Sequence, residues 1–294
     1  MKEFEQLENK RKKCPYFVYG GIGGIALSLL LMFVSTASDI PILPGFCFIA
    51  LFACLILIII GNVQFKKIEK DFKKIYMKKI VEEVIPGATY QENIGIPLND
   101  VYKSRLLKQA DREKSEDLIQ GNIKGVNFKS SDLQLMERRV HVDSKGHRTV
   151  TYVPYFTGRF FIFDFNKTFK GDLLITEAFP YNQYGMKKVT MESEEFNQKF
   201  KTYAHDDLSA FYVLTPHLMV SLLELEKRNP GTIMISINSN VMYMGINNNR
   251  DTFSLKMSRK IDDSLITSFK NDINVINNII DEMNLNNKIF KEEY

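Results

Sequence analysis

The 294-residue sequence contains no tryptophan and only three cysteines, Cys14, Cys47 and Cys54. All three lie in or beside two uncharged apolar runs, so the rest of the chain can form neither a disulfide framework nor a thiolate metal site. This pattern is consistent with a reducing compartment, although it does not require one.

Sequence motifs of common catalytic sites are also absent. The chain has no Gly-x-Ser-x-Gly, His-Glu-x-x-His, Cys-x-x-Cys or EF-hand pattern. Its glycine-rich segment, residues 20–24, lies inside an apolar run and follows no strand, so it is not a phosphate-binding loop. These absences favour a non-enzymatic protein without excluding an enzyme, and we expect no cofactor and no resident metal ion.

Charged residues are missing from two adjacent segments, residues 14–35 and 40–60. Each is close to the ~20 apolar residues that cross a bilayer core as a helix. We interpret residues 14–61 as a transmembrane helical hairpin. Gly20 and Gly24 would allow close helix packing within the hairpin or between protomers, or are simply glycines tolerated in a membrane helix. One alternative is a cleaved signal peptide, which we disfavour because it would have a shorter apolar stretch with no second one directly after it. The other is a pair of core helices in a soluble protein, which we disfavour because such helices would not need matched basic flanks.

Most of the excess positive charge lies beside this hairpin. Residues 1–80 hold twelve Lys or Arg and six acids, a net charge of +6, whereas residues 81–294 carry −2 within the chain total of +4. The short loop between the two apolar runs has no Lys or Arg. Because basic flanks remain on the cytoplasmic side, we predict a multi-pass protein of the cell membrane with a basic tail at residues 1–13 and both termini cytoplasmic.

Residues 62–85 read as an amphipathic helix that forms a neck after the second span. Apolar residues recur every three or four positions until Pro86-Gly87 ends the pattern. The other face carries lysines that we expect to contact anionic headgroups. Alternatively, these lysines determine the membrane topology and keep that face of the helix solvated. These lysines are Lys66, Lys67, Lys70, Lys73 and Lys74.

Residues 86–294 are predicted to form a cytoplasmic α+β domain with packed helices and a mostly antiparallel sheet. The clearest β-hairpin is residues 133–155 around the turn at Asp143–Gly146, preceded by a charged loop at residues 111–117 and two short strand pieces within 118–127. The other predicted strands are residues 158–165, 173–178, 187–191, 232–237, 241–246 and 253–257, with turns at residues 166–172 and 238–240. The predicted helices are residues 101–109, 192–200, 215–229 and 262–285. A partly closed barrel with a terminal helix is an alternative arrangement.

Aromatic residues crowd one predicted strand, at Phe160, Phe161, Phe163 and Phe165. Adjacent aromatics point to opposite faces of a strand, which indicates burial on both sides. A platform for stacking bases would instead need a basic surface, and this domain is slightly acidic. We therefore expect no nucleic-acid partner.

Three stretches resemble a known family. They are residues 156–171 (FTGRFFIFDFNKTFKG), residues 189–226 with their ESxEF and LTP elements, and the ISINSNVMYMGI segment. Together with the apolar hairpin they resemble a bacterial family of two-span, membrane-anchored proteins known only as a domain of unknown function. The resemblance implies an integral membrane protein and supplies no catalytic residues.

Histidine and acidic residues offer the candidate sites. His205-Asp206-Asp207 is the most reactive-looking combination, since a carboxylate can tune an imidazole; a helix cap formed by Asp206 or Asp207 is the simpler interpretation. His141 and His147 flank a turn with Asp143 between them, but an exposed turn makes a poor metal site. His217 is expected at the surface, in the first turn of a helix.

The leading hypothesis is therefore a non-catalytic membrane protein whose cytoplasmic domain binds a partner protein or the membrane surface. One alternative is a membrane-associated enzyme, such as a hydrolase, using the region of His205, Asp206 and Asp207. Another is a subunit or assembly factor of a membrane complex. A protein partner or homo-oligomer is expected beside the bilayer itself.

The topology can be tested with a reporter enzyme that is active only outside the cytoplasm. Fused after Tyr294, the reporter should be silent, because the basic flanks keep the C-terminus inside. Inserted after Ser38, in the loop between the spans, it should be active. An active fusion at Tyr294 would reverse the assigned orientation.

Overall fold

The computed structural model describes residues 2–37, 43–178 and 185–285. The chain divides into two compact units. The first comprises residues 1–77 and 254–268, and the second residues 78–253 and 269–294.

Two long helices dominate the first unit. Helix α1 is Lys2–Ala37 and α2 is Leu43–Phe72; a π-helical segment, Lys73–Met77, then leads into α3, Lys78–Val84. Both helices are long and apolar enough to cross a membrane, so the two predicted spans are candidate membrane spans by length and composition. Large apolar side chains such as Phe33 and Ile49 are 78% and 68% exposed, as a helix surface facing lipid would be.

The packing glycines differ from those expected. A Cβ on Gly21 would lie 2.6 Å from Ile58 Cγ1, and one on Gly24 would collide with the Cys54 sulfur. A Cβ on Gly20 would meet nothing within 4 Å. Gly24 thus packs against α2 as predicted, but its partner position is Gly21, three residues away, because that spacing also returns to the same side of a helix.

Segment 254–261 is held by charged side chains of the two long helices and is not the predicted strand 253–257. Glu8 accepts hydrogen bonds from Arg11 at 2.8 Å and from the backbone N–H of Ile261 at 2.9 Å. Arg11 donates to the carbonyl of Met257, and Glu69 accepts from the N–H of Leu255 at 2.8 Å. Because these contacts satisfy the backbone, the segment needs no sheet neighbour.

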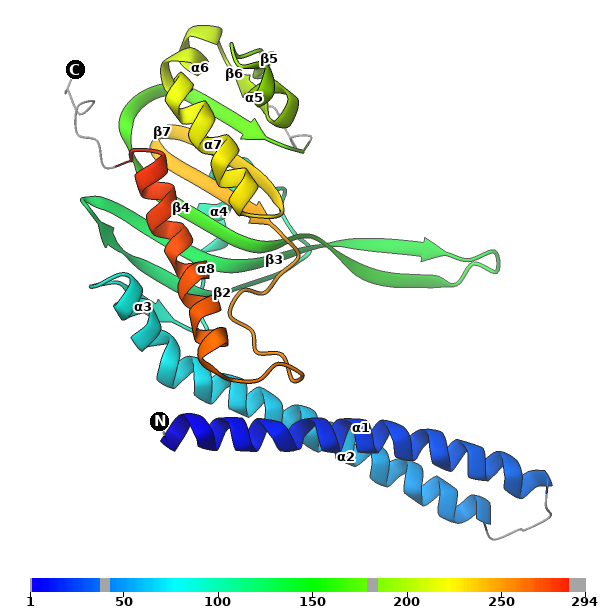
Figure 1. Ribbon diagram of the computed structural model, residues 1–294. Coiled ribbons are helices and arrows are strands. Elements are labelled where there is room, and N and C mark those ends of the chain that lie inside the picture. The colour runs from blue at the N-terminus through cyan, green and yellow to red at the C-terminus, as the bar shows by residue number, and fades with distance from the viewer. Residues whose placement is uncertain (1, 38–42, 179–184, 286–294) are drawn as a thin grey trace. The chain divides into compact units, whose positions relative to one another are not determined.

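The second unit contains an antiparallel seven-stranded sheet with path β1-β2-β3-β4-β6-β5, on which β7 also pairs with β4 (Figure 1). This confirms the α+β class with mainly antiparallel pairing. The described strands form an open path, not the alternative barrel. The strands are β1 Thr89–Gln91, β2 Arg112–Ile123, β3 Val126–Val142, β4 Arg148–Thr176, β5 Lys187–Val189, β6 Lys201–Ala204 and β7 Thr232–Asn247.

Two of the predicted turns are wrong, for a common reason. The segment 166–172 lies within the single long strand β4, and residues 238–240 lie within the single strand β7. The two segments face each other in the β4–β7 pairing, where the register shifts on either side of the Phe169–Ser239 pair. Ser239 has φ +57°, so the turn-type residues form a bulge across two strands that continue through it.

Two other errors concern the start of β2 and the strand β6. Residues 111–117, predicted as a charged loop, include the start of β2, where the ladder to β3 outweighs the unfavourable composition. Strand β6 was not predicted; it pairs with the end of β4 and with β5. By contrast, the hairpin at residues 133–155 and strand β5 are confirmed.

Helices α5, α6 and α7 of the second unit begin at side-chain caps, whereas α4 begins after Pro97 with no side-chain cap bond. Ser193 and Thr215 accept hydrogen bonds from the N–H groups of Phe196 and Leu218. Helix α6 begins at the Asp206 cap. The helices are α4 Leu98–Lys103, α5 Glu194–Lys199, α6 Asp207–Val213, α7 Pro216–Arg228 and α8 Asp263–Glu282.

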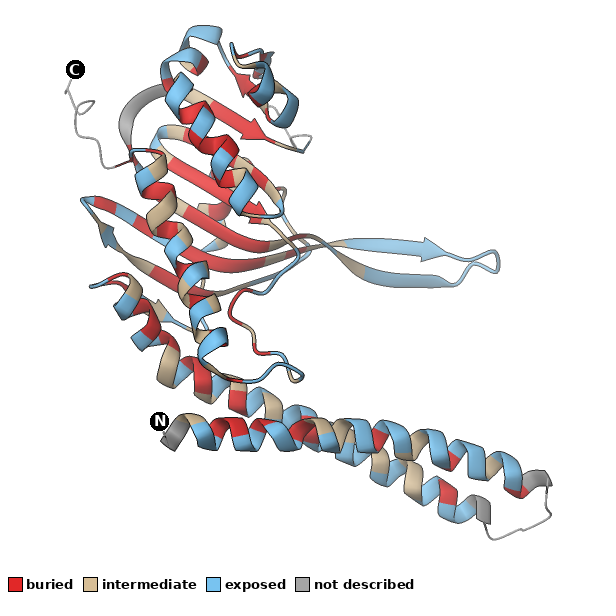
Figure 2. Ribbon diagram, viewed as in Figure 1, coloured by how far each residue is buried: buried red, intermediate tan, exposed pale blue. Residues whose placement is uncertain are grey.

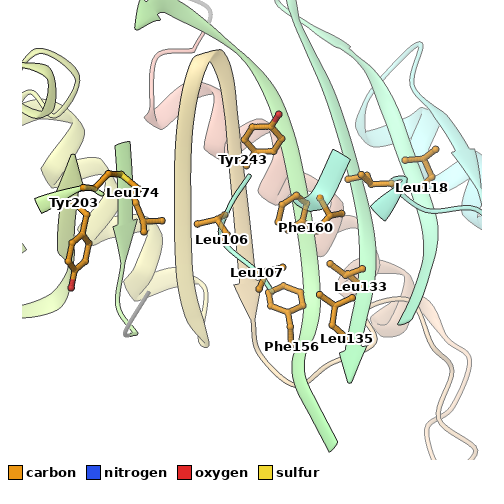
Figure 3. Close-up of a cluster of buried hydrophobic side chains, with 13 residues drawn as sticks. Leu106, Leu107, Leu118, Leu133, Leu135, Phe156, Phe160, Leu174, Tyr203 and Tyr243 are labelled. Atoms are coloured by element: carbon orange, nitrogen blue, oxygen red, sulfur yellow. The ribbon is translucent and has the colours of Figure 1, made fainter. Parts of the chain in front are cut away.

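Most residues in the central strands of the sheet are buried (Figure 2), and the buried positions are mainly apolar. Phe156 and Phe160 join a cluster on one face with residues of α4 and of the segment that follows it (Figure 3). Phe161 and Phe163 stack at 6.0 Å on the other face. The predicted two-sided burial of this aromatic strand is therefore confirmed.

The glycine contacts predict a sharp difference among substitutions in α1. Gly21→Leu or Gly24→Leu should destabilise the helical hairpin by ~1–3 kcal/mol, because the new side chain meets α2. Gly20→Leu and Gly23→Leu, which meet open space, are the matched controls. Thermal loss of helicity in detergent would report the difference, and equal effects at all four positions would contradict this packing.

Candidate functional site

Strands β3 and β4 extend beyond the rest of the sheet as a two-stranded ribbon, residues 137–153 (Figure 1). The pairing of β2 with β3 ends at Met136, and the pairing of β7 with β4 begins at Gly158. Among the described residues, no further strand pairs with the outer edges of the ribbon. Residues 138–151 are all exposed (Figure 2), so this is the part of the sheet most available for contact.

The two faces of the ribbon differ in chemistry. Cross-strand partners share a face, and the pairs Val140–Val150, Val142–Arg148 and Arg138–Tyr152 lie on one of them. We call these six residues the valine face. The opposite face carries the pairs Glu137–Val153, Arg139–Thr151 and His141–Thr149. Val140, Val142 and Val150 are 45%, 53% and 42% exposed, which is unusual for valine on a sheet.

Polar contacts fix the base of the ribbon. Asp111 accepts a hydrogen bond from the N–H of Arg138 at 2.7 Å, and Glu137 forms ion pairs with Lys108 and Arg139. The guanidinium of Arg112 lies 3.5 Å from the centre of the Tyr152 ring. These contacts hold the ribbon in place where its sheet neighbours end.

Asp143 organises the tip. Its carboxylate accepts hydrogen bonds from the N–H groups of Lys145 and His147, at 2.9 and 2.8 Å, and lies 2.9 Å from His147 Nδ1. The contact with His147 is the largest cause of the lowered pKa of Asp143. Gly146 has φ +83°, which completes the predicted turn. His147 and Asp143 are thus occupied in turn formation.

A buried ion pair lies where the ribbon joins the sheet. Asp132 on β3 and Arg159 on β4 are 4% and 5% exposed, with Asp132 Oδ1 3.6 Å from Arg159 Nε. Arg159 also donates to the Ser130 hydroxyl at 2.7 Å and to the carbonyl of Asp272 at 3.2 Å. Asp132 accepts from the N–H of Thr252 at 2.6 Å. The pair therefore ties β3 and β4 to the segment before residue 254 and to α8.

Further carboxylates surround this pair. The side-chain oxygens of Glu116, Asp117 and Asp251 lie within 4.8 Å of one another, the arrangement closest to a cation site among the described residues. Lys114 already lies beside Glu116, at 2.5 Å, and beside Asp251, at 3.8 Å. An ammonium group thus supplies positive charge to these acids.

The contacts of His205, Asp206 and Asp207 are those of structural residues. Asp206 caps α6 by accepting from the N–H and hydroxyl of Ser209, at 2.8 and 2.6 Å. Asp207 lies 3.2 Å from Lys187 Nζ, and His205 Nε2 lies 3.6 Å from Asp172 on an exposed surface. The three side chains have separate partners and do not converge on a common point. His217, at the surface as expected, contacts Asn284.

The predicted headgroup lysines separate into two groups. Lys66, Lys67, Lys70 and Lys74 are exposed. Lys73 is only 8% exposed, because it lies in the π-helical segment where the helix face rotates. Four of the five lysines thus have exposed side chains.

Sequence reasoning identified the ribbon as a hairpin but did not recognise it as a candidate binding surface. The available signal was the alternation of valine with polar residues, arginine and histidine on the first strand and threonine on the second, since exposed valines require an explanation when both strands of a hairpin carry them. The Asp132–Arg159 pair left no such signal, because its members are 27 positions apart.

Residues 154–285 match the model of a family described as "Protein of unknown function (DUF3137)". This match confirms the resemblance to a domain of unknown function over the part of the chain from the end of the ribbon to α8. No curated protein matches the chain. The crystal structure of the mycobacterial trehalose monomycolate transport factor A, TtfA, aligns with a TM-score of 0.36 at 7% identity, covering 67% of this chain and 92% of that chain. A TM-score this low carries no inference about fold or function.

The buried pair predicts a pH-dependent stability. Burial, together with the charges of Asp117 and Asp251, raises the pKa of Asp132 to about 7 despite the opposing effect of Arg159. The folded state binds the proton of Asp132 more tightly than the unfolded chain does, so protonation of Asp132 stabilises the fold. This stabilisation is fully present below the unfolded pKa of about 4. It is lost as pH rises to 7, where the free energy of unfolding falls by up to ~1.4 kcal/mol per pH unit.

Thermal unfolding of the full chain in detergent between pH 5 and 8 would check this. Asp132→Asn, which cannot titrate, should have a flatter pH profile than the wild-type chain, whatever its absolute stability. Parallel profiles would show that Asp132 does not titrate in this range.

Proposed function

We propose that this chain is a membrane-anchored, non-catalytic binding protein whose binding element is the ribbon at residues 137–153. The observation that carries the proposal is that the ribbon extends past its sheet neighbours and exposes three valines. Isolated two-stranded hairpins are only marginally stable, so an exposed apolar face on one is a cost that contact with a target would offset.

The two long helices support the anchoring part of the proposal. Their length and hydropathy suit a membrane, and the basic flanks favour a cytoplasmic location for the second unit. The exposed neck lysines Lys66, Lys67, Lys70 and Lys74 suit contact with headgroups. A target in or at the membrane would also be compatible with a role as subunit or assembly factor of a membrane complex.

Binding is preferred over catalysis because of what the reactive-looking residues contact. Asp206 caps a helix and Asp207 pairs with a lysine, so neither is oriented by His205 or orients it. General acid–base chemistry needs such groups within hydrogen-bond reach of a shared substrate position.

Photo-cross-linking in cell membranes tests the binding element. A photoreactive amino acid at Val142 should form a discrete adduct, with protein or with lipid, that mass spectrometry identifies. Val220 on α7 is the matched control, because it is a valine of almost the same exposure, 55% against 53%. Absence of an adduct at Val142, or equal labelling at both positions, would remove the ribbon from the proposed function.

A further inference from the structure

The acidic side chains of the ribbon are paired with basic ones, whereas most of its basic side chains have no ion-pair partner among the described residues. Residues 137–153 contain four Lys or Arg and two acids. Glu137 is neutralised by Lys108 and Arg139, and Asp143 is occupied by the turn and His147. Within the described ranges of the chain, Arg138, Lys145 and Arg148 form no ion pair. The ribbon therefore presents three uncompensated cations on a domain whose overall charge is negative.

These cations lie beside the exposed apolar side chains. Arg138 and Arg148 belong to the valine face, at its two ends, and Lys145 lies in the adjoining turn. Tyr152 is paired with Arg138 on the same face. A surface of apolar side chains bordered by Arg, Lys and Tyr has the composition of elements that bind at the boundary between headgroups and acyl chains.

We propose that the valine face binds the anionic phospholipid surface of the bilayer in which the chain is anchored. This deepens the proposed function and rests on it, since it names the target of the same ribbon. The three unpaired cations complement anionic headgroups, and the valines enter the boundary region. A chain that carries its own membrane spans keeps the bilayer at high effective concentration, so even weak contacts would be populated.

The backbone limits how deeply the ribbon can enter. Its outer edges have no strand neighbour among the described residues, and unpaired N–H and C=O groups are costly in hydrocarbon. The ribbon would therefore lie in the hydrated headgroup region with only the valine side chains directed inward. The same edges carry Arg138, Arg139 and Arg148, and charged edge positions disfavour the addition of a strand from another protein.

The absence of tryptophan makes a face-specific test possible. Val142→Trp introduces a single indole on the valine face, and Thr149→Trp introduces one on the opposite face. The full chain is placed in nanodiscs of phosphatidylcholine, either alone or mixed with phosphatidylglycerol. The Val142→Trp emission should shift to shorter wavelength with phosphatidylglycerol and be quenched by brominated acyl chains, while Thr149→Trp should retain the emission of an exposed indole.

Charge dependence provides the second readout. Arg138→Gln with Arg148→Gln, in the Val142→Trp chain, should abolish the shift, and circular dichroism would verify that the sheet is retained. Raising the salt from ~0.1 M to ~1 M reduces the Debye length from ~10 Å to ~3 Å and should reverse the shift.

An unchanged Val142→Trp emission in both kinds of nanodisc would overturn the lipid assignment, as would an equal shift at Thr149→Trp. If Val142 nevertheless cross-links to a protein in cell membranes, the binding role of the ribbon stands and its target is a protein. If neither the emission nor the cross-linking responds, both proposals fail.

Discussion

The backbone hydrogen bonds of β4 hold the second unit together. This strand runs from Arg148 to Thr176 and pairs in succession with β3, β7 and β6. Buried peptide groups must find partners, and a strand longer than any neighbour can satisfy them only by recruiting several. The need to pair the peptide groups of β4 explains why β3, β7 and β6 all lie beside it. It also explains the ribbon, because β3 and β4 continue pairing with each other after β2 and β7 have ended.

Side chains reinforce β4 at the point where its neighbours change. The Asp132–Arg159 pair links β3 to β4 inside the sheet, and its hydrogen bonds reach Ser130, Thr252 and the Asp272 carbonyl. A buried charge is tolerated only when such partners surround it. The ribbon outside this point has no core of its own, so its valines remain exposed, and Arg138, Lys145 and Arg148 have no ion-pair partner among the described residues. The strands β3 and β4 are thus held by buried polar contacts inside the sheet and are exposed in the ribbon beyond it.

The helices of the two units differ in how their apolar side chains are exposed and packed. In the first unit, Gly21 and Gly24 allow α1 to approach α2 closely, while the outward faces expose large apolar side chains. Water would penalise that surface, whereas lipid would not. In the second unit, helices begin at polar caps such as Ser193, Asp206 and Thr215 and pack apolar faces inward. The helices of the first unit thus suit association with a membrane, whereas those of the second unit pack against a core.

The sequence alone determined the two long apolar helices, the helices within residues 192–200, 215–229 and 262–285, the hairpin at residues 133–155 and the two-sided burial of Phe160 and Phe161, because each is encoded by residues close together in the chain. Only the tertiary structure decided that residues 166–172 and 238–240 continue their strands, since the two segments stabilise each other across the β4–β7 ladder. It also decided which glycines meet α2, that Lys73 is buried, and that Asp132 meets Arg159. Those outcomes depend on partners distant in sequence, which no local pattern records.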